Sequence, residues 1–197
     1  TVIVRDAAEH DPNLRRGVVV AMRGLFADVD DGERVWSCTV RRILRTRLIK
    51  ERGPVAVGDH VRFRVEPSRT GVAEEGAIEV VEPRGGQLRR LAHRRIQTNV
   101  ANVDQAIIVA SAAHPDFKPH LIDRYIVAAL HGNIAPVVCL NKIDLDEGGI
   151  ASSGVERYEA FGYPVLRTSV EAHEGIAELR AVLKDKESVI AGQSGVG

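Results

Sequence analysis

Apolar positions in roughly the first eighty residues fall in short stretches separated by turn residues. Val61, Phe63 and Val65 alternate with charged side chains, which is the period-two pattern of a strand with one face in water. Comparable stretches cover residues 17–21, 25–29, 35–40 and 78–81. Four or five strands in about 70 residues, without a long helical stripe, are typical of a small closed barrel. We therefore predict an all-β OB-fold over residues 15–83, behind a tail of residues 1–14.

The pattern changes after residue 102, where continuous apolar runs alternate with helical spacing. The apolar runs, which indicate buried strands, cover residues 106–110, 136–140, 164–167 and 188–191. Apolar residues at helical spacing mark three segments, 121–130, 154–161 and 176–183. This order predicts a parallel sheet covered by helices, an α/β domain over residues 103–197. Ligands of such sheets bind beyond the carboxyl ends of the strands.

Four residues with guanine-reading chemistry directly follow the second of these strands: Asn141, Lys142, Ile143 and Asp144. The Asp144 carboxylate can accept hydrogen bonds from both N1–H and the exocyclic amine of guanine, whereas adenine offers no matching pair of donors. The stem of Lys142 can cover one face of the base, and Asn141 can join neighbouring loops. Such a tetrapeptide also occurs as an ordinary turn, but its position at a strand end favours a guanine site.

Two further segments at strand ends complete the predicted site. Thr168 and Ser169 lie at the end of the third strand, where a backbone N–H could contact guanine O6, although a Ser-Thr helix cap would look the same. A glycine-rich loop follows the last strand and consists of Gly192, Gln193, Ser194, Gly195, Val196 and Gly197. Glycines let successive backbone N–H groups turn towards one anion, so we read this loop as the first part of a phosphate-binding loop rather than a simple glycine turn.

Charge divides the chain, although 27 basic and 27 acidic side chains cancel overall. Residues 1–100 carry a balance of +5 and residues 101–197 a balance of −5. Two basic clusters dominate the first half; their members include Arg41, Arg42, Arg45, Arg47, Arg89, Arg90, Arg94 and Arg95. The second cluster lies in a predicted basic linker, residues 84–102. Basic clusters attract phosphate backbones, although a solvated arginine-rich face is the plainer alternative.

Aromatic side chains are too few in the predicted barrel for extensive base stacking. Phe26, Trp36 and Phe63 are its aromatics, and the simplest interpretation makes Trp36 and Phe63 core residues. We therefore expect any bound RNA to be recognised by its backbone or shape.

Cysteine content and hydropathy exclude several classes of protein. Cys38 and Cys139 stand far apart, without further cysteines or histidines at metal-ligand spacing, so we expect neither a disulfide nor a metal site. Apolar runs are much shorter than the ~20 residues of a membrane span. These features predict a cytoplasmic protein without a membrane partner, and we expect a monomer.

The order of the two nucleotide motifs is the sharpest clue to family. The guanine tetrapeptide precedes the phosphate loop by about fifty residues, whereas ordinary GTPases have the phosphate loop first. A barrel, then Asn-Lys-Ile-Asp, then Thr-Ser, then the glycine-rich loop resembles the bacterial ribosome small subunit-dependent GTPase family, whose G domain is circularly permuted. The sequence segments 98–105 and 122–125 also resemble that family.

The resemblance implies a GTPase that acts late in maturation of the small (30S) ribosomal subunit and binds its rRNA through the barrel. It also implies GTP and GDP as ligands with Mg²⁺, and zinc in a further domain that follows the G domain in that family. The lysine and hydroxyl residues that complete the phosphate loop, and the switch segments, would follow Gly197. We therefore expect a truncated G domain with no catalytic residue and no GTP hydrolysis by the 197-residue chain alone.

Two other readings remain open at this point. One is a non-enzymatic RNA-binding OB protein with a vestigial nucleotide-binding domain. The other is a phosphate-loop kinase or ATPase, which has no evident need for Asn141, Lys142 and Asp144 at a strand end.

Overall fold

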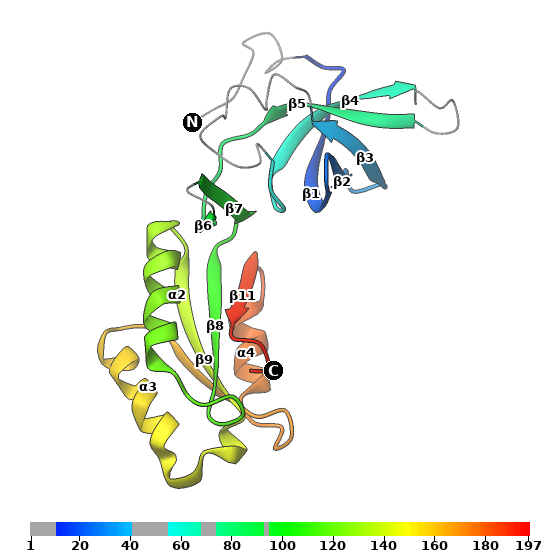
Figure 1. The fold of residues 1–197 in the computed structure, drawn as a ribbon. Helices are drawn as coiled ribbons and strands as arrows, with labels where there is room; N and C mark the ends of the chain where they lie inside the picture. Colours follow the sequence, from blue (N-terminus) through cyan, green and yellow to red (C-terminus); the bar gives the residue numbers. More distant parts are fainter. Residues whose placement is uncertain (1–10, 41–54, 68–73, 93–94) are drawn as a thin grey trace. The chain divides into compact units, whose positions relative to one another are not determined.

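A computed structural model describes residues 11–40, 55–67, 74–92 and 95–197. The chain divides into two compact units, residues 1–102 and residues 103–197. The first unit is built from strands and the second from alternating strands and helices, as the apolar patterns predict (Figure 1).

The first unit contains a closed five-stranded barrel. Its strands are β1 (Arg15–Arg23), β2 (Phe26–Asp30), β3 (Val35–Val40), β4 (His60–Pro67) and β5 (Glu74–Val81). They follow the order β1-β2-β3-β5-β4, and β4 pairs with β1 to close the sheet. All pairs are antiparallel except β3 with β5. The predicted barrel is therefore confirmed, with five strands.

The barrel encloses an apolar core. Val19, Val29 and Phe63 are fully buried, and the Trp36 ring lies 5.7 Å from the Phe63 ring, centroid to centroid. Trp36 and Phe63 are thus core residues, as the simplest interpretation of the sequence held. Cys38 is a free buried thiol, and burial raises its pKa to about 12.

Residues 84–102, expected as a linker, contain an antiparallel hairpin. Its strands are β6 (Gln87–Ala92) and β7 (Arg95–Ala101). The base of the hairpin is joined to the segment that precedes β4, because the Ala101 N–H donates to Val57 O at 2.9 Å and the Asn102 amide to Gly58 O at 2.8 Å. The two strands pair with each other, and only the attachment of their base to the segment before β4 depends on partners about forty residues away in sequence. An arginine-rich composition indicates solvation and does not reveal either contact.

The second unit is a parallel sheet in the order β10-β9-β8-β11. Its strands are β8 (Gln105–Ser111), β9 (Ala135–Asn141), β10 (Val165–Thr168) and β11 (Ser188–Gly192). The helices are α2 (Pro119–His131), α3 (Ile150–Ala160) and α4 (Ile176–Leu183), with short 3₁₀ turns at Ile143–Leu145 and Glu147–Gly149. Figure 1 shows α2 and α3 on one side of the sheet and α4 on the other.

Burial in this sheet explains why its strands are continuous apolar runs. Ile107, Ile108, Val138 and Leu140 are at most 1% exposed, because helices cover both faces. On the α4 side, Ile107 and Val137 pack with residues of that helix, Leu179, Val182 and Leu183. No helix in the described part of the chain is long and apolar enough to cross a membrane.

Candidate nucleotide-binding site

The predicted nucleotide motifs meet at one edge of the parallel sheet. Strands β8, β9, β10 and β11 end at Ser111, Asn141, Thr168 and Gly192, and the carboxyl ends of neighbouring parallel strands share an edge. The loops that leave these ends therefore converge. They carry the guanine tetrapeptide, Ser169 and the glycine-rich loop.

Asn141 links three of these segments. Its amide Nδ2 donates to the Val196 carbonyl at 2.9 Å, and its Oδ1 accepts from the Thr168 hydroxyl at 2.9 Å. Thr168 is buried, so its hydroxyl needs this partner. One side chain at the end of β9 thus joins the end of β10 to the glycine-rich loop.

Lys142 forms a second connection to the same loop. Its backbone is left-handed, with φ 59°, which is uncommon for a residue other than glycine. The ammonium donates to Gly195 O at 2.7 Å and to His114 O at 2.5 Å. Lys142 is therefore shared between the glycine-rich loop and the segment that follows β8.

Asp144 is exposed, and a hydrogen bond from the buried Ser169 hydroxyl orients its carboxylate. The Ser169 hydroxyl donates to Asp144 Oδ1 at 2.5 Å, and the backbone N–H of Ala172 donates to the Ser169 hydroxyl at 3.0 Å. Ser169 is 0% exposed, which restricts the directions that its hydroxyl can take. The arrangement leaves the Asp144 carboxylate accessible to a ligand at the strand ends.

The backbone N–H of Ser169 itself is not the one that could contact guanine O6. This N–H donates to Glu174 O at 3.0 Å, and Glu174 returns a hydrogen bond to Ser169 O at the same distance. A reciprocal pair of this kind leaves the N–H engaged within the protein. Ser169 contributes to the site through its hydroxyl, which holds Asp144. Its position at a strand end did not reveal this role, because a helix-capping serine would occupy the same position.

The glycine-rich loop turns at a left-handed glycine and lies against the sheet. Gly195 has φ 89°, a conformation that favours glycine, and Val196 between the glycines is 7% exposed. Gly192 approaches β8 closely, because a Cβ there would lie 2.6 Å from Val109 O. These contacts fix the loop at the sheet edge.

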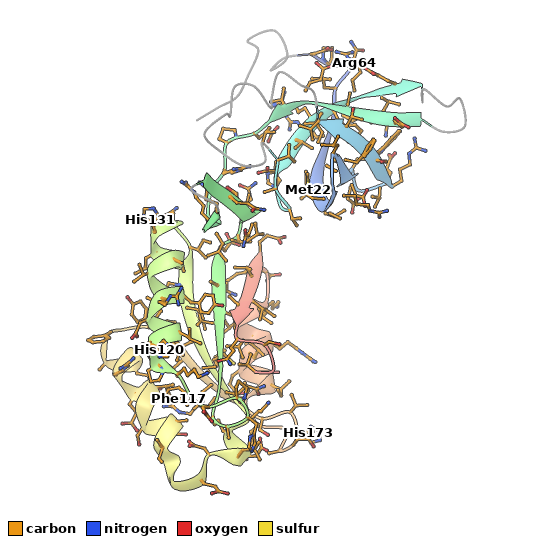
Figure 2. The ribbon with its side chains drawn as sticks, viewed as in Figure 1. Met22, Arg64, Phe117, His120, His131 and His173 are labelled. Carbon is orange, nitrogen blue, oxygen red and sulfur yellow. The ribbon has the colours of Figure 1, made fainter. Side chains whose placement is uncertain are left out.

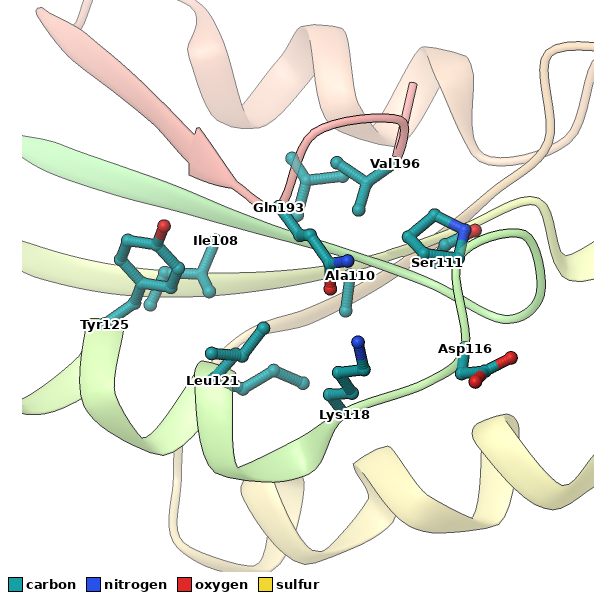
Figure 3. Close-up of a pocket in the computed structure, with 12 residues that line it drawn as sticks. Ile108, Ala110, Ser111, Asp116, Lys118, Leu121, Tyr125, Gln193 and Val196 are labelled. Atoms are coloured by element: carbon teal, nitrogen blue, oxygen red, sulfur yellow. The ribbon is translucent and has the colours of Figure 1, made fainter.

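A small cavity of about 20 Å³ lies beside this loop. Lys118, Leu121 and Tyr125 line it from α2 and the residue before it, and Gln193 and Val196 line it from the glycine-rich loop (Figure 3). This volume suits a water molecule and not a nucleotide. A nucleotide must therefore bind outside the cavity, over the loops at the strand ends.

Sequence reasoning missed two features that support the site. Asp146 receives hydrogen bonds from the N–H groups of Ala151 and Ser152, at 3.0 and 2.8 Å, and so caps α3 directly after the guanine tetrapeptide. An acidic residue shortly before a predicted helix is a signal that could have found it. The second feature is the segment 112–118, which holds His114; its sequence carries no motif.

The arginines predicted to bind RNA lie in different parts of the structure. Arg41, Arg42, Arg45, Arg47 and Arg94 lie outside the described residues, Arg90 and Arg95 lie in β6 and β7, and Arg89 is exposed. Arg84, from the same basic cluster, instead pairs with the fully buried Asp59 at 2.7 Å. The sequence cannot separate these cases, because both arginines look alike in a basic run.

A β-barrel followed along the chain by a parallel sheet, with the loop of residues 141–144 ahead of the glycine-rich loop, is the fold of a circularly permuted GTPase. A model of the RsgA GTPase family matches residues 81–197. The chain belongs to this family.

Relatives and solved structures agree with this assignment. The small ribosomal subunit biogenesis GTPase RsgA of Shewanella oneidensis is 38% identical over 92% of this chain and 50% of its own length, and that of Geobacillus thermodenitrificans is 38% identical over 91% and 57%. The crystal structure of YjeQ from Thermotoga maritima matches with a TM-score of 0.70 and 34% identity, over 93% of this chain and 62% of that one. YloQ, described as a circularly permuted GTPase, matches with a TM-score of 0.66 and 30% identity, over 98% and 64%. The chain spans about half the length of the curated relatives it matches.

Proposed function

We propose that the protein carrying this chain binds and hydrolyses GTP as a biogenesis factor of the small ribosomal subunit. Its relatives bear that description in their names. The observation that carries the proposal is that Asn141 and Lys142, beside Asp144, are joined to the glycine-rich loop by hydrogen bonds of 2.9 and 2.7 Å. A turn of unrelated purpose would have no reason to join those two loops.

Each residue has a separate task in this proposal. Asp144 accepts the two donors of guanine, and Ser169 holds the carboxylate in place. Asn141 and Lys142 keep the base-reading loop in register with the phosphate loop. The glycine-rich loop of Gly192, Gln193, Ser194, Gly195, Val196 and Gly197 binds phosphate oxygens through backbone N–H groups other than that of Val196, which donates to Gln193 O at 3.4 Å. Ile143 connects the tetrapeptide.

Discrimination follows from donor count and from the desolvation of the exposed Asp144 carboxylate when a base covers it. A carboxylate aimed at the base and left without its donors by adenine costs binding energy, so a preference for guanine of about 10⁴-fold is expected. The kinase or ATPase alternative does not use this arrangement.

Mg²⁺ accompanies nucleoside triphosphates in phosphoryl transfer, where it would neutralise phosphate charge. The described part of the chain contains no group of three or more His, Cys, Asp or Glu side chains that could hold a metal ion. We assign no residue of this chain as a ligand of either metal. Catalysis is proposed for the complete protein, and the 197-residue chain alone is expected to be inactive.

Recognition of rRNA is assigned to the barrel unit. The basic cluster around the β6–β7 hairpin supports this, because Arg89 is exposed and no acidic residue occurs between Glu82 and Asp104. The protein would then act in the cytoplasm as a monomer on the small subunit. A non-enzymatic RNA-binding protein is the competing function.

The test is GTP turnover by the complete protein, with and without purified small ribosomal subunits. Stimulation by the subunit is expected. GTP turnover that is the same with and without the subunit would support the GTPase activity and refute the ribosomal partner. Absence of turnover in both conditions would favour the RNA-binding alternative.

A further inference from the structure

We propose that the segment 112–118, named here the 112–118 loop, positions the nucleotide site, and that Phe117 packed against Gly154 is its anchor. The inference rests on the proposed nucleotide function and adds positioning residues to it. Neither Phe117 nor Gly154 belongs to a nucleotide motif. Their role follows from what each end of the loop contacts.

One end of the loop is fixed on helix α3. A Cβ built at Gly154 would lie 2.5 Å from Phe117 Cε1 and 3.1 Å from Phe117 Cζ, so the ring occupies the space that any other residue at 154 would need. Figure 2 shows Phe117 beside α3. Glycine inside a helix is destabilising relative to alanine. The contact with the ring gives a physical reason for its presence at mid-helix.

The other end of the loop holds Lys142. The carbonyl of His114 accepts from the Lys142 ammonium at 2.5 Å, while Gly195 O accepts from the same ammonium at 2.7 Å. Pro115 Cδ lies 3.7 Å from the place where a Gly195 Cβ would be. The loop therefore touches both the base-reading loop and the glycine-rich loop.

Backbone conformation shows that this contact is held in place. His114 has φ 47° and Lys142 has φ 59°, and left-handed conformations are unfavourable for both residue types. Such residues persist where the surrounding structure determines their conformation. Phe117, three residues from His114, supplies that constraint from α3.

Displacement of the Phe117 ring should therefore change nucleotide affinity through Lys142. If the His114 carbonyl moves, Lys142 loses one of its two acceptors and the tie between the two nucleotide loops loosens. The Ser169–Asp144 hydrogen bond lies outside this path. Affinity for guanine nucleotides should fall, while the preference for guanine over adenine should stay unchanged.

The experiment measures GDP and ADP affinity of the complete protein and of the variants Gly154→Ala and Phe117→Leu. We expect both variants to bind GDP roughly 3- to 30-fold more weakly, with an unchanged ratio of GDP to ADP affinity. Ser153→Ala, an exposed position on the same helix, is the matched control and should bind GDP as the unsubstituted protein does. Thermal unfolding identifies a variant that fails to fold, and Phe117→Leu, which keeps an apolar contact, is then the variant to compare.

A second arm separates positioning from general structural damage. In a Lys142→Met background, Gly154→Ala should cause no further loss of GDP affinity, because its effect passes through Lys142. Equal losses in both backgrounds, or variants that bind GDP normally, would overturn the inference. An unsubstituted protein that binds no guanine nucleotide would instead refute the proposed function on which the inference rests.

Discussion

The two units bury different kinds of polar side chain. Among the described residues, the barrel unit buries the carboxylates of Asp28 and Asp59, and arginines pair with them at 2.6 and 2.7 Å. The α/β unit buries only neutral polar groups: Gln105, Ser111, Thr168 and Ser169. Its charged site residue, Asp144, is exposed.

This difference separates the carboxylates that are paired within the barrel from the carboxylate that is open to a ligand in the α/β unit. In the barrel, a ligand that bound a buried carboxylate would first have to break its ion pair, so these charges are engaged within the protein. In the α/β unit, the buried Ser169 hydroxyl orients the Asp144 carboxylate, which stays accessible. No described buried side-chain nitrogen or oxygen lacks a hydrogen-bond partner. Both arrangements are therefore complete without a ligand.

The strongest test of this contrast is Arg84→Met in the barrel. The guanidinium contacts both oxygens of Asp59, at 2.7 and 2.8 Å, and Asp59 is 0% exposed. Removing it leaves a buried unpaired charge, so the free energy of unfolding should fall by about 3–5 kcal/mol. Trp36, the chain's one tryptophan, is buried in the barrel core, and its fluorescence follows denaturation of this unit.

A double variant provides the control for Arg84. Asp59→Asn combined with Arg84→Met removes the charge and keeps an acceptor for the Ala56 N–H, so it should recover part of the lost stability. A loss below about 1 kcal/mol in the single variant would show that the ion pair is not structural.

A smaller effect is expected at the cap of α3. Burial alone would raise the pKa of Asp146, but hydrogen bonds from Ser152 and from the Ala151 N–H lower it below its usual 3.8. Asp146→Ala should cost about 1 kcal/mol at neutral pH. Because the folded-state pKa is lowered, this contribution is present above about pH 3.8 and is lost as pH falls through the folded value.

The measurement for Asp146 is hydrogen exchange in α3 together with denaturation, at pH 7 and below pH 3. The difference between the unsubstituted protein and the variant should shrink in acid, and Trp36 fluorescence should report no change in the barrel. A difference that is constant with pH would contradict ionic capping.

The smallest effect on stability is expected at Arg89, an exposed residue of the β6–β7 hairpin. Arg89→Gln should change the free energy of unfolding by less than about 0.5 kcal/mol. It should nevertheless weaken binding to small ribosomal subunits and reduce the dependence of log affinity on log salt by about one unit. Arg180→Gln, an exposed arginine on α4, is the charge-matched control. Equal effects of both variants would remove the hairpin from the RNA interface.

Much of the fold was predictable because its signals are local. The strands of the α/β unit fall within a residue or two of the predicted ranges, since burial on both faces makes them continuous apolar runs. The site positions were predictable for a related reason. Residues 141–144 and 192–197 directly follow strands, and parallel strands end at one edge.

Features that depend on distant partners were not predictable from one sequence. Arg84 and Arg89 belong to one basic run, but only Arg84 meets a buried carboxylate, 25 residues away in the chain. The engagement of the Ser169 N–H depends on the turn that brings Glu174 back to it. Phe117 carries no motif, and its contact with Gly154 requires α2 and α3 to be packed together.

The central claim is that Asp144, held by Ser169, reads guanine at the strand ends. The most direct test compares the affinities of GDP, ADP and xanthosine diphosphate for the complete protein and for its Asp144→Asn variant. An asparagine offers one acceptor and one donor, which matches the N1–H and the C2 carbonyl of xanthine better than the two donors of guanine. We predict that GDP affinity falls at least about 100-fold and that the variant prefers xanthosine diphosphate. Unchanged ratios among the three nucleotides would contradict the assignment of Asp144.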